Sequence, residues 1–551
     1  MPERLADLSH PHGFCEVLLT VLTHAARNRS RWTRRVHHCA CVFALLSLGL
    51  ASSAAANISL PVLSGDQAGS DDEPKAVRFL VGEVLHNPTS DGVTVGFMPA
   101  EDVSVAIEYG NEALGMRLTD ELESKARQMG MVPLKGLQPG GDYQYRLLVR
   151  RPVADEAVPR ELHSFRTLDL PGSTFSFAVL ADPHAWAMWT RKDCSNNPTG
   201  YNVMRAAMDN IRNDPEIDFV LIGTDSVMTL CGKGCKACRV DGERVAQGDS
   251  QTLQDALLRY RAVLSKDIYG RFASEQPMLY MLGDHDGEKG WTIEGGAGEY
   301  TVAQQNLSYE ARRHAIPNAH DSYGGDPAGA YYALRAGDLL LVVLAAQRYS
   351  SEVPMGPENW SLGEAQLIWL EETLANSDAR FKIVTAEHLV GGASDPNGPT
   401  WKGRGGLTAT DNGKINGTFL GEQFLIHEMM KEHGAQLFLS FHDHVVAWGE
   451  KVDEEYRGEG VYYAIGGQAA AAGPPGWASL PWYKEAMDYD EDGVPEYQTG
   501  TTGTEAKGHF KVTVHGDERL ELEYIEASEV KKANGNKVLG FTIEAEPPAE
   551  R

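Results

Sequence analysis

Between residues 76 and 168, short runs of β-forming residues follow one another, and polar turn residues separate them. Runs of this length bounded by glycine, proline and aspartate are typical of strands, and several in succession predict an all-β sandwich over residues 76–168. The runs are RFLVGEVL, GVTVGFM, VSVAIEYG, YQYRLLVR and LHSFRTL.

From Phe175 the pattern changes to continuous apolar runs that alternate with segments of helical period. A helical pattern occupies GYNVMRAAMDNIRND, and a second helix is expected to begin at Ser361, where SLGE reads as a capping box. The alternation predicts α/β layers with a largely interior sheet over residues 175–530, closed by the hairpin HFKVTVHGDERLELEYIEA. Residues 531–551 are expected to form a polar C-terminal tail. The apolar runs are FSFAVLAD, IDFVLIGTD, PMLYMLGD, DLLLVVLAA, FKIVTAEH, AQLFLSFHDH and VYYAIGG.

The amino end has the features of a secretory signal. Several arginines precede the apolar run CACVFALLSLGLA, and Ala54–Ala56 supply a cleavage site. The apolar run is shorter than the ~20 residues that span a bilayer as a helix. We therefore expect residues 1–56 to be removed, residues 57–75 to be a flexible leader, and the mature chain to be secreted or periplasmic with no membrane span.

The net charge limits the partners of the protein. The chain carries a formal charge of −27, so its surface repels nucleic acid and anionic membranes at long range. An anionic small molecule can still be a substrate where a local cation cancels this field. We therefore expect no nucleic-acid binding.

Four cysteines follow the predicted signal, in an exported chain where an even number indicates disulfides. The spacing in CGKGCKAC also permits a zinc site together with Cys194. Two disulfides or one metal site are therefore alternative interpretations of these cysteines. The cysteines are Cys194, Cys231, Cys235 and Cys238.

Potential metal ligands follow the apolar runs of the α/β part. Because the carboxyl ends of neighbouring parallel strands meet at one crevice, aspartates and histidines at these ends are expected to converge. One histidine in such a loop is usually an ordinary packed residue, but a series of strand ends with Asp or His indicates a metal site. The residues are Asp182 and His184, Asp225, Asp284 and His285, His388, and His442, Asp443 and His444.

The order of these residues resembles the calcineurin-like metallophosphoesterases over about residues 175–470. The preceding sandwich, whose segment LKGLQPGGDYQYRLLV is similar to the late strands of fibronectin type III modules, resembles purple acid phosphatases and alkaline phosphatase D-type enzymes. The resemblance implies a two-sheet α/β sandwich preceded by an all-β, fibronectin III-like sandwich. It also implies two metal ions, Fe, Mn or Zn, with calcium left open by the acidic loop DYDEDG.

Carried over residue by residue, the resemblance implies two ligand sets that share Asp225, with His285 off the metals as the catalytic group. His285 would stabilise the charge on phosphorus and protonate the leaving oxygen. The first metal would be held by Asp182, His184, Asp225 and His444, and the second by Asp225, Asp284, His388 and His442.

The chain departs from the family pattern at a few positions. Thr224 and Phe441 stand where glycine is usual before Asp225 and His442, and Met228 stands where purple acid phosphatases have a metal-bound tyrosine. Asp284 replaces an asparagine, as in alkaline phosphatase D-type enzymes. Thr224, Phe441 and Asp284 remove no ligand, and the resemblance implies that His184 replaces the missing tyrosine as a ligand.

The sequence therefore predicts an exported, dinuclear, metal-dependent phosphohydrolase in which metal-bound water attacks a phosphomonoester or a phosphodiester directly. A catalytically silent binding or adhesion protein on the same scaffold is the alternative, in which the departures mark decay. A metal-storing protein is a third interpretation, suggested by the cysteines and the acidic loop. Metal stoichiometry distinguishes these three possibilities.

Overall fold

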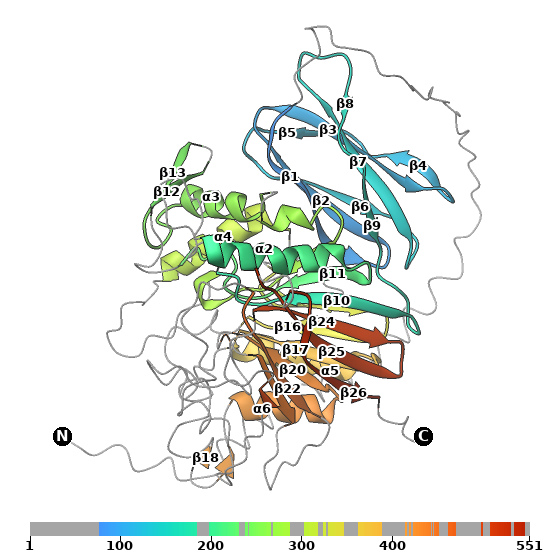
Figure 1. The fold of residues 1–551 in the computed structure, drawn as a ribbon, viewed down its shortest axis with the longest axis vertical. Helices are drawn as coiled ribbons and strands as arrows, with labels where there is room; N and C mark the ends of the chain where they lie inside the picture. The colour runs from blue at the N-terminus through green and yellow to red at the C-terminus, as the bar shows by residue number, and fades with distance from the viewer. Residues whose placement is uncertain are drawn as a thin grey trace, which may run out of the picture. The chain divides into compact units, whose positions relative to one another are not determined.

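Figure 1 shows the computed structural model of the chain. Residues 1–76 and 77–551 are two units, and every residue described below belongs to the second. The predicted signal and leader lie outside the described residues. These are 77–184, 198–230, 237–240, 242–265, 268–286, 302–317, 323–326, 329–345, 362–387, 414–415, 418–419, 422–441, 444, 446–450, 461–469, 498–499, 507–529 and 534–545.

The first part is an all-β sandwich, as predicted (Figure 1). Alternate residues of its strands, such as Tyr143, Tyr145 and Leu147, face a common buried core between the two layers. One layer holds β1 (Phe79–Thr89), β2 (Gly92–Pro99) and β6 (Gly130–Lys135), and the other holds β3 (Val103–Asn111), β4 (Gly115–Leu118), β5 (Leu122–Ser124), β7 (Asp142–Arg150), β8 (Val158–Pro159) and β9 (His163–Arg166).

The sandwich shares a sheet with the α/β part. Strand β1 pairs in parallel with β14 (Met278–Tyr280), with His86 opposite Met278. The result is a nine-stranded sheet in the order β26-β25-β24-β10-β11-β14-β1-β2-β6. Its other strands are β10 (Thr174–Leu180), β11 (Ile217–Ile222), β24 (Gly508–His515), β25 (Arg519–Glu526) and β26 (Lys537–Glu544).

Both faces of this sheet are buried, which explains why its central strands are continuous apolar runs. In β10, Ala178 and Leu180 pack toward the helices, whereas Phe177 and Val179 pack toward a second sheet. The helices on the first face are α2 (Pro198–Asn213), α3 (Leu253–Val263) and α4 (Val302–Ala315), with η1 (Tyr269–Arg271) and the hairpin of β12 (Cys238–Val240) and β13 (Glu243–Val245) beside them.

The second sheet has the order β15-β16-β17-β20-β22-β21-β23. The buried Lys382 links this sheet to helix α5 (Gly363–Asn376) and to the residue after helix α6 (Glu422–Glu432), because its Nζ donates to the carbonyl oxygens of Leu374 at 2.8 Å and His433 at 2.7 Å. The fold is therefore the predicted two-sheet α/β sandwich. The strands are β15 (Tyr332–Ala336), β16 (Leu339–Val343), β17 (Phe381–Thr385), β20 (Leu437–Ser440), β21 (Val446–Glu450), β22 (Tyr462–Gly466) and β23 (Gln498–Thr499), with the separate pair β18 (Lys414–Ile415) and β19 (Thr418–Phe419).

Two expectations are corrected. Residues 531–551 are not only a polar tail, because β26 pairs with β25 and buries Phe541 and Ile543 against the core. A strand at the edge of a sheet needs apolar residues on one face only, so its sequence can resemble a polar tail. Helix α5 begins at Gly363 with Leu362 at its N-cap and no side-chain cap, so the capping box is not confirmed.

Among the described helices, none is both long and apolar enough to cross a membrane.

Candidate metal centre

Loops at the carboxyl ends of neighbouring strands bring the predicted residues together. Asp182 and His184 follow β10, Asp225 follows β11, and His285 lies in η2 (Asp284–Asp286), directly after β14. His444 comes from the second sheet, after β20. Because β10, β11 and β14 are adjacent and parallel, their ends meet at one edge, as the sequence predicted.

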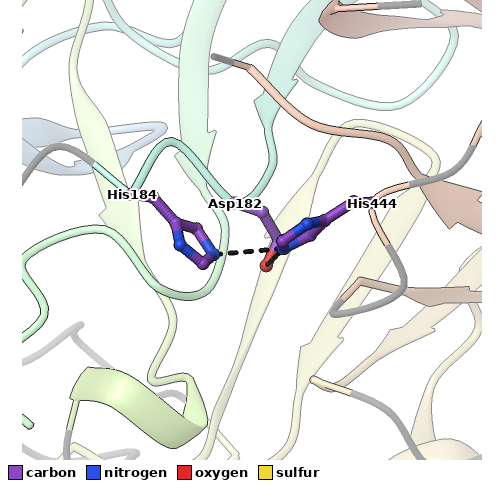
Figure 2. A group of neighbouring side chains, drawn as sticks. All are labelled: Asp182, His184 and His444. Atoms are coloured by element: carbon purple, nitrogen blue, oxygen red, sulfur yellow. Dashed lines mark hydrogen bonds and ion pairs between the residues drawn. The ribbon is translucent and has the colours of Figure 1, made fainter. Parts of the chain in front are cut away.

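The first group of ligand atoms consists of Asp182, His184 and His444, shown in Figure 2. These atoms lie within 4.8 Å of one another, and all three residues are buried. The Nε2 atoms of His184 and His444 are 3.1 Å apart, and His444 Nε2 lies 4.0 Å from Asp182 Oδ1. Two imidazoles and one carboxylate aimed at one point can bind a transition metal ion.

Asp225 joins this group to its neighbours. Its Oδ2 lies 3.2 Å from His184 Nε2, and its backbone oxygen accepts a hydrogen bond from the His184 backbone N–H at 3.1 Å. The Oδ1 atom accepts from the His285 backbone N–H at 3.0 Å. Asp225 is therefore held between His184 and His285.

A third carboxylate, which the sequence analysis did not single out, completes a second group. Asp182, Asp225 and Glu387 place one oxygen each within 4.8 Å of the others, and all are buried. Glu387 follows β17 and directly precedes His388 in AEH. The signal in the sequence is the position of Glu387 at the end of the apolar run FKIVTA, where a ligand is expected.

His285 is oriented by its own loop. Its Nδ1 lies 2.6 Å from the backbone oxygen of Leu230, and because a carbonyl oxygen only accepts, Nδ1 carries the hydrogen. Its Nε2 lies 3.9 Å from Asp225 Oδ2, and the side chain is 28% exposed. The ring therefore turns Nε2 toward the site, and the side chain is partly open to solvent.

Asp286 holds the Asp225 loop in place. Its buried carboxylate accepts hydrogen bonds from the backbone N–H groups of Ser226, Val227 and Met228, at 2.6, 2.9 and 2.6 Å. Burial and the charge of Asp225 raise the pKa of Asp286 above its ordinary value. The role of Asp286, the carboxylate that follows His285, is therefore to position the loop that carries Asp225.

Several residues of the site have left-handed backbone conformations. The φ angles are 38° for Asp182, 44° for His184, 55° for Asp225 and 56° for His444. This conformation costs about 1–2 kcal/mol for a residue with a side chain, and such residues cluster at functional sites. Surrounding structure thus holds the ligands in positions that the backbone alone would not favour.

The departures from the family pattern have structural counterparts. The hydroxyl of the buried Thr224 donates to Asp182 Oδ1 at 3.3 Å. The ring of Phe441 occupies the space above two glycines, because a Cβ on Gly466 would lie 2.6 Å from that ring and one on Gly223 3.2 Å away. Thr224 therefore supports a ligand, and glycines opposite Phe441 accommodate its bulk.

Part of the predicted ligand set is not tested. His388 and His442 lie outside the described residues, and Asp284 is described only in its backbone, at the start of η2. Of the predicted cysteine partners, Cys194, Cys231 and Cys235 also lie outside them, and Cys238 is described only in its backbone, at the start of β12. These assignments stay predictions.

The fold and this arrangement of Asp and His at the strand ends are those of a metallophosphoesterase. Residues 188–459 match the family model described as PhoD-like phosphatase. This match, together with two similar solved structures, supports the metallophosphoesterase superfamily, of the type that contains PhoD and the purple acid phosphatases.

Two solved structures are similar over most of the chain. The structure of PhoD has a TM-score of 0.61 at 15% identity and covers 86% of this chain and 92% of its own. The purple acid phosphatase PPD1 from yellow lupin (Lupinus luteus) seeds has a TM-score of 0.54 at 14% identity, over 84% of this chain and 74% of its own. At these identities the likeness shows the fold. No curated protein matches the sequence.

The residues present fit the metal ions that this superfamily uses. Imidazole and carboxylate donors are the ligands that Fe, Mn and Zn prefer. The space between the donors is also kept open, because a Cβ on Gly283 would lie 2.5 Å from Asp225 Oδ1 and 2.7 Å from Glu387 Oε2. The matches and this donor set support a metal-dependent phosphatase.

Proposed function

We propose that the protein is an exported phosphohydrolase that cleaves phosphomonoesters or phosphodiesters at a site for two metal ions. One observation carries the proposal: the two groups of ligand atoms share Asp182, and Asp225 lies 3.2 Å from His184 of the first group. Adjacent groups that share one carboxylate, with a second carboxylate beside it, suit two cations a few ångströms apart.

Each ligand has a defined role in this proposal. Asp182, His184 and His444 would hold one ion and Asp225 would bridge to the second, for which the sequence also predicts Asp284, His388 and His442. When bound, the ions would polarise the phosphoryl group and lower the pKa of a coordinated water to near neutrality. The structure around Asp182 and Asp225 holds their backbones in left-handed conformations, so these carboxylates are in place before substrate binds.

His285 would act on the substrate and not on the metals. Its Nε2 reaches the edge of the site while Nδ1 is held by Leu230. A protonated ring could donate a hydrogen bond to a phosphoryl oxygen and then a proton to the leaving oxygen.

Export and substrate class rest on the sequence. The basic, apolar and small-residue segments of residues 1–56 support secretion. The charge of −27 makes the surface unfavourable for an anionic ester, so the local cations would supply the attraction. A small phosphate ester is the expected substrate class.

The test compares the purified chain with Asp225→Asn. We expect about two metal ions per chain by elemental mass spectrometry, and hydrolysis of p-nitrophenyl phosphate or its bis ester. The variant should lose metal and activity together. Asp218→Asn is a matched control, because Asp218 lies in β11, the strand that Asp225 follows, but at the far end from the site, where its Oδ2 accepts from the Ser176 backbone N–H at 3.2 Å. A chain that binds no ion would refute the proposal, and two ions without turnover would favour a binding protein.

A further inference from the structure

Glu387 is fixed at the point where the two sheets meet. Its side chain is fully buried, and its backbone oxygen accepts a hydrogen bond from the Phe441 N–H at 2.7 Å. That bond joins the end of β17 to the end of β20, which carries His444 a few residues later. The carboxylate is thus positioned by two neighbouring strands.

The nearest carboxylates come from the other sheet. Oxygen atoms of Glu387, Asp182 and Asp225 all lie within 4.8 Å of one another. Gly283 makes this approach possible, because a Cβ there would lie 2.7 Å from Glu387 Oε2 and 2.5 Å from Asp225 Oδ1. Gly283 therefore preserves a space between carboxylates from two sheets.

Three buried carboxylates at this separation repel one another. Their charged forms are unfavourable in a low-dielectric interior, because each lacks bulk water and raises the energy of the others. A cation of charge two or three among them removes both penalties. The arrangement is thus complementary to a metal ion.

We propose that Glu387 is itself a ligand of the metal centre, forming an all-carboxylate group with Asp182 and Asp225. This inference rests on the proposed function, since it adds a ligand to the same centre. A further carboxylate increases the negative charge of the donor set and favours cations that prefer oxygen, such as Mn²⁺, over Zn²⁺, which accepts nitrogen and sulfur more readily.

Metal titration of the full chain tests the inference directly. The chain is stripped of metal, and binding of Mn²⁺ and of Zn²⁺ is measured by calorimetry for the wild type and for Glu387→Gln. We expect Mn²⁺ to bind at one position more than ~100-fold more weakly in the variant, beyond the 10- to 100-fold that loss of an outer-shell partner causes. The loss for Zn²⁺ should be smaller. Glu372→Gln, the same change at an exposed site on α5, should leave both unchanged.

Stability of the metal-free chain gives a readout that does not depend on activity. Glu387→Gln removes one of three repelling charges, so the metal-free variant should melt at a higher temperature than the metal-free wild type. Addition of Mn²⁺ should then raise its melting temperature less. A purely structural Glu387 would give the opposite result: a less stable metal-free chain with unchanged metal affinity.

The outcomes distinguish a failure of this inference from a failure of the proposed phosphohydrolase function. Two ions in the wild type, with unchanged Mn²⁺ affinity in Glu387→Gln, would overturn the role of Glu387 and leave the phosphohydrolase proposal intact. A wild type without bound metal would overturn both. Glu387→Asp keeps the charge on a shorter side chain, and should recover part of the lost affinity.

Discussion

At the scale of single residues, the site combines ligands with neighbours that hold them in place. Thr224 donates to Asp182, Asp286 binds the loop of Asp225, and Leu230 fixes the ring of His285. Loss of such outer partners typically lowers metal affinity or activity 10- to 100-fold. Their effects are therefore measurable separately from those of the ligands.

Replacing His285 should separate turnover from metal binding. In His285→Gln we expect kcat to fall about 10²- to 10⁴-fold, the usual contribution of a general acid, with metal content unchanged because His285 lies outside both ligand groups. The limb of the pH–rate profile that reports the acid should also disappear. The exposed His314 on α4 provides the control His314→Gln. Loss of metal from His285→Gln would contradict the assigned role.

Thr224 should matter through its hydroxyl. Thr224→Val keeps the shape but removes the donor to Asp182, so we expect metal affinity to fall by about tenfold. Thr224→Ser, which keeps the hydroxyl, should bind metal nearly as the wild type does. Equal affinities for the valine and serine variants in a calorimetric titration would refute this role.

At the scale of elements, the ends of β10, β11, β14, β17 and β20 position the site, and the packing between the two sheets sets the distances across it. A contact within the second sheet also lies close to the site: Phe441 and Gly466 meet at the ends of the adjacent strands β20 and β22. A large ring on one strand and a glycine on the other occupy a single volume. The two positions are therefore expected to be coupled.

Substitutions at this contact should be non-additive. Gly466→Ala places a Cβ 2.6 Å from the Phe441 ring, and overpacking of this kind costs about 1–3 kcal/mol of unfolding free energy. Phe441→Ala leaves a cavity and costs about 3–5 kcal/mol. Because alanine at position 441 removes the ring that a Cβ at position 466 would meet, the double variant should be more stable than the sum of the single changes predicts. Urea unfolding of all four proteins measures this; additive values would exclude the coupling.

The strand ends were predictable from sequence, but contacts between sheets were not. Asp182, Asp225 and His285 follow buried apolar runs, so their convergence needed only the rule for parallel strands. Glu387 meets Asp225 because two sheets pack face to face at one particular offset, which no local pattern encodes. The same limit applies to β1, whose pairing with β14 joins the sandwich to the α/β sheet.

At the scale of the whole molecule, buried histidines connect stability to pH. Burial lowers the pKa of His86 from 6.5 to about 3, and that of His509 from 6.5 to about 4. Between pH 6.5 and these values the unfolded state binds more protons than the folded state. Stability therefore falls as the pH falls through this window, by up to about 1.4 kcal/mol per pH unit for each histidine.

Replacement of His86 should reduce this dependence. From the two pKa values, lowering the pH from 7 to 5 should cost the wild type about 2 kcal/mol through His86 alone. His86→Leu should lose that much less between the same pH values in urea unfolding, whereas His314→Gln should behave like the wild type. An unchanged pH dependence in His86→Leu would show that this ring does not titrate on unfolding.

The proposed ligands come from both sheets: Asp182 and Asp225 from the nine-stranded sheet, and Glu387 and His444 from the other. Ions bound there would act as a cross-link between the halves of the α/β core. Metal supply would then control how long a chain survives as well as how fast it turns over. Chains that stay without metal would open more often, and proteases would remove them first.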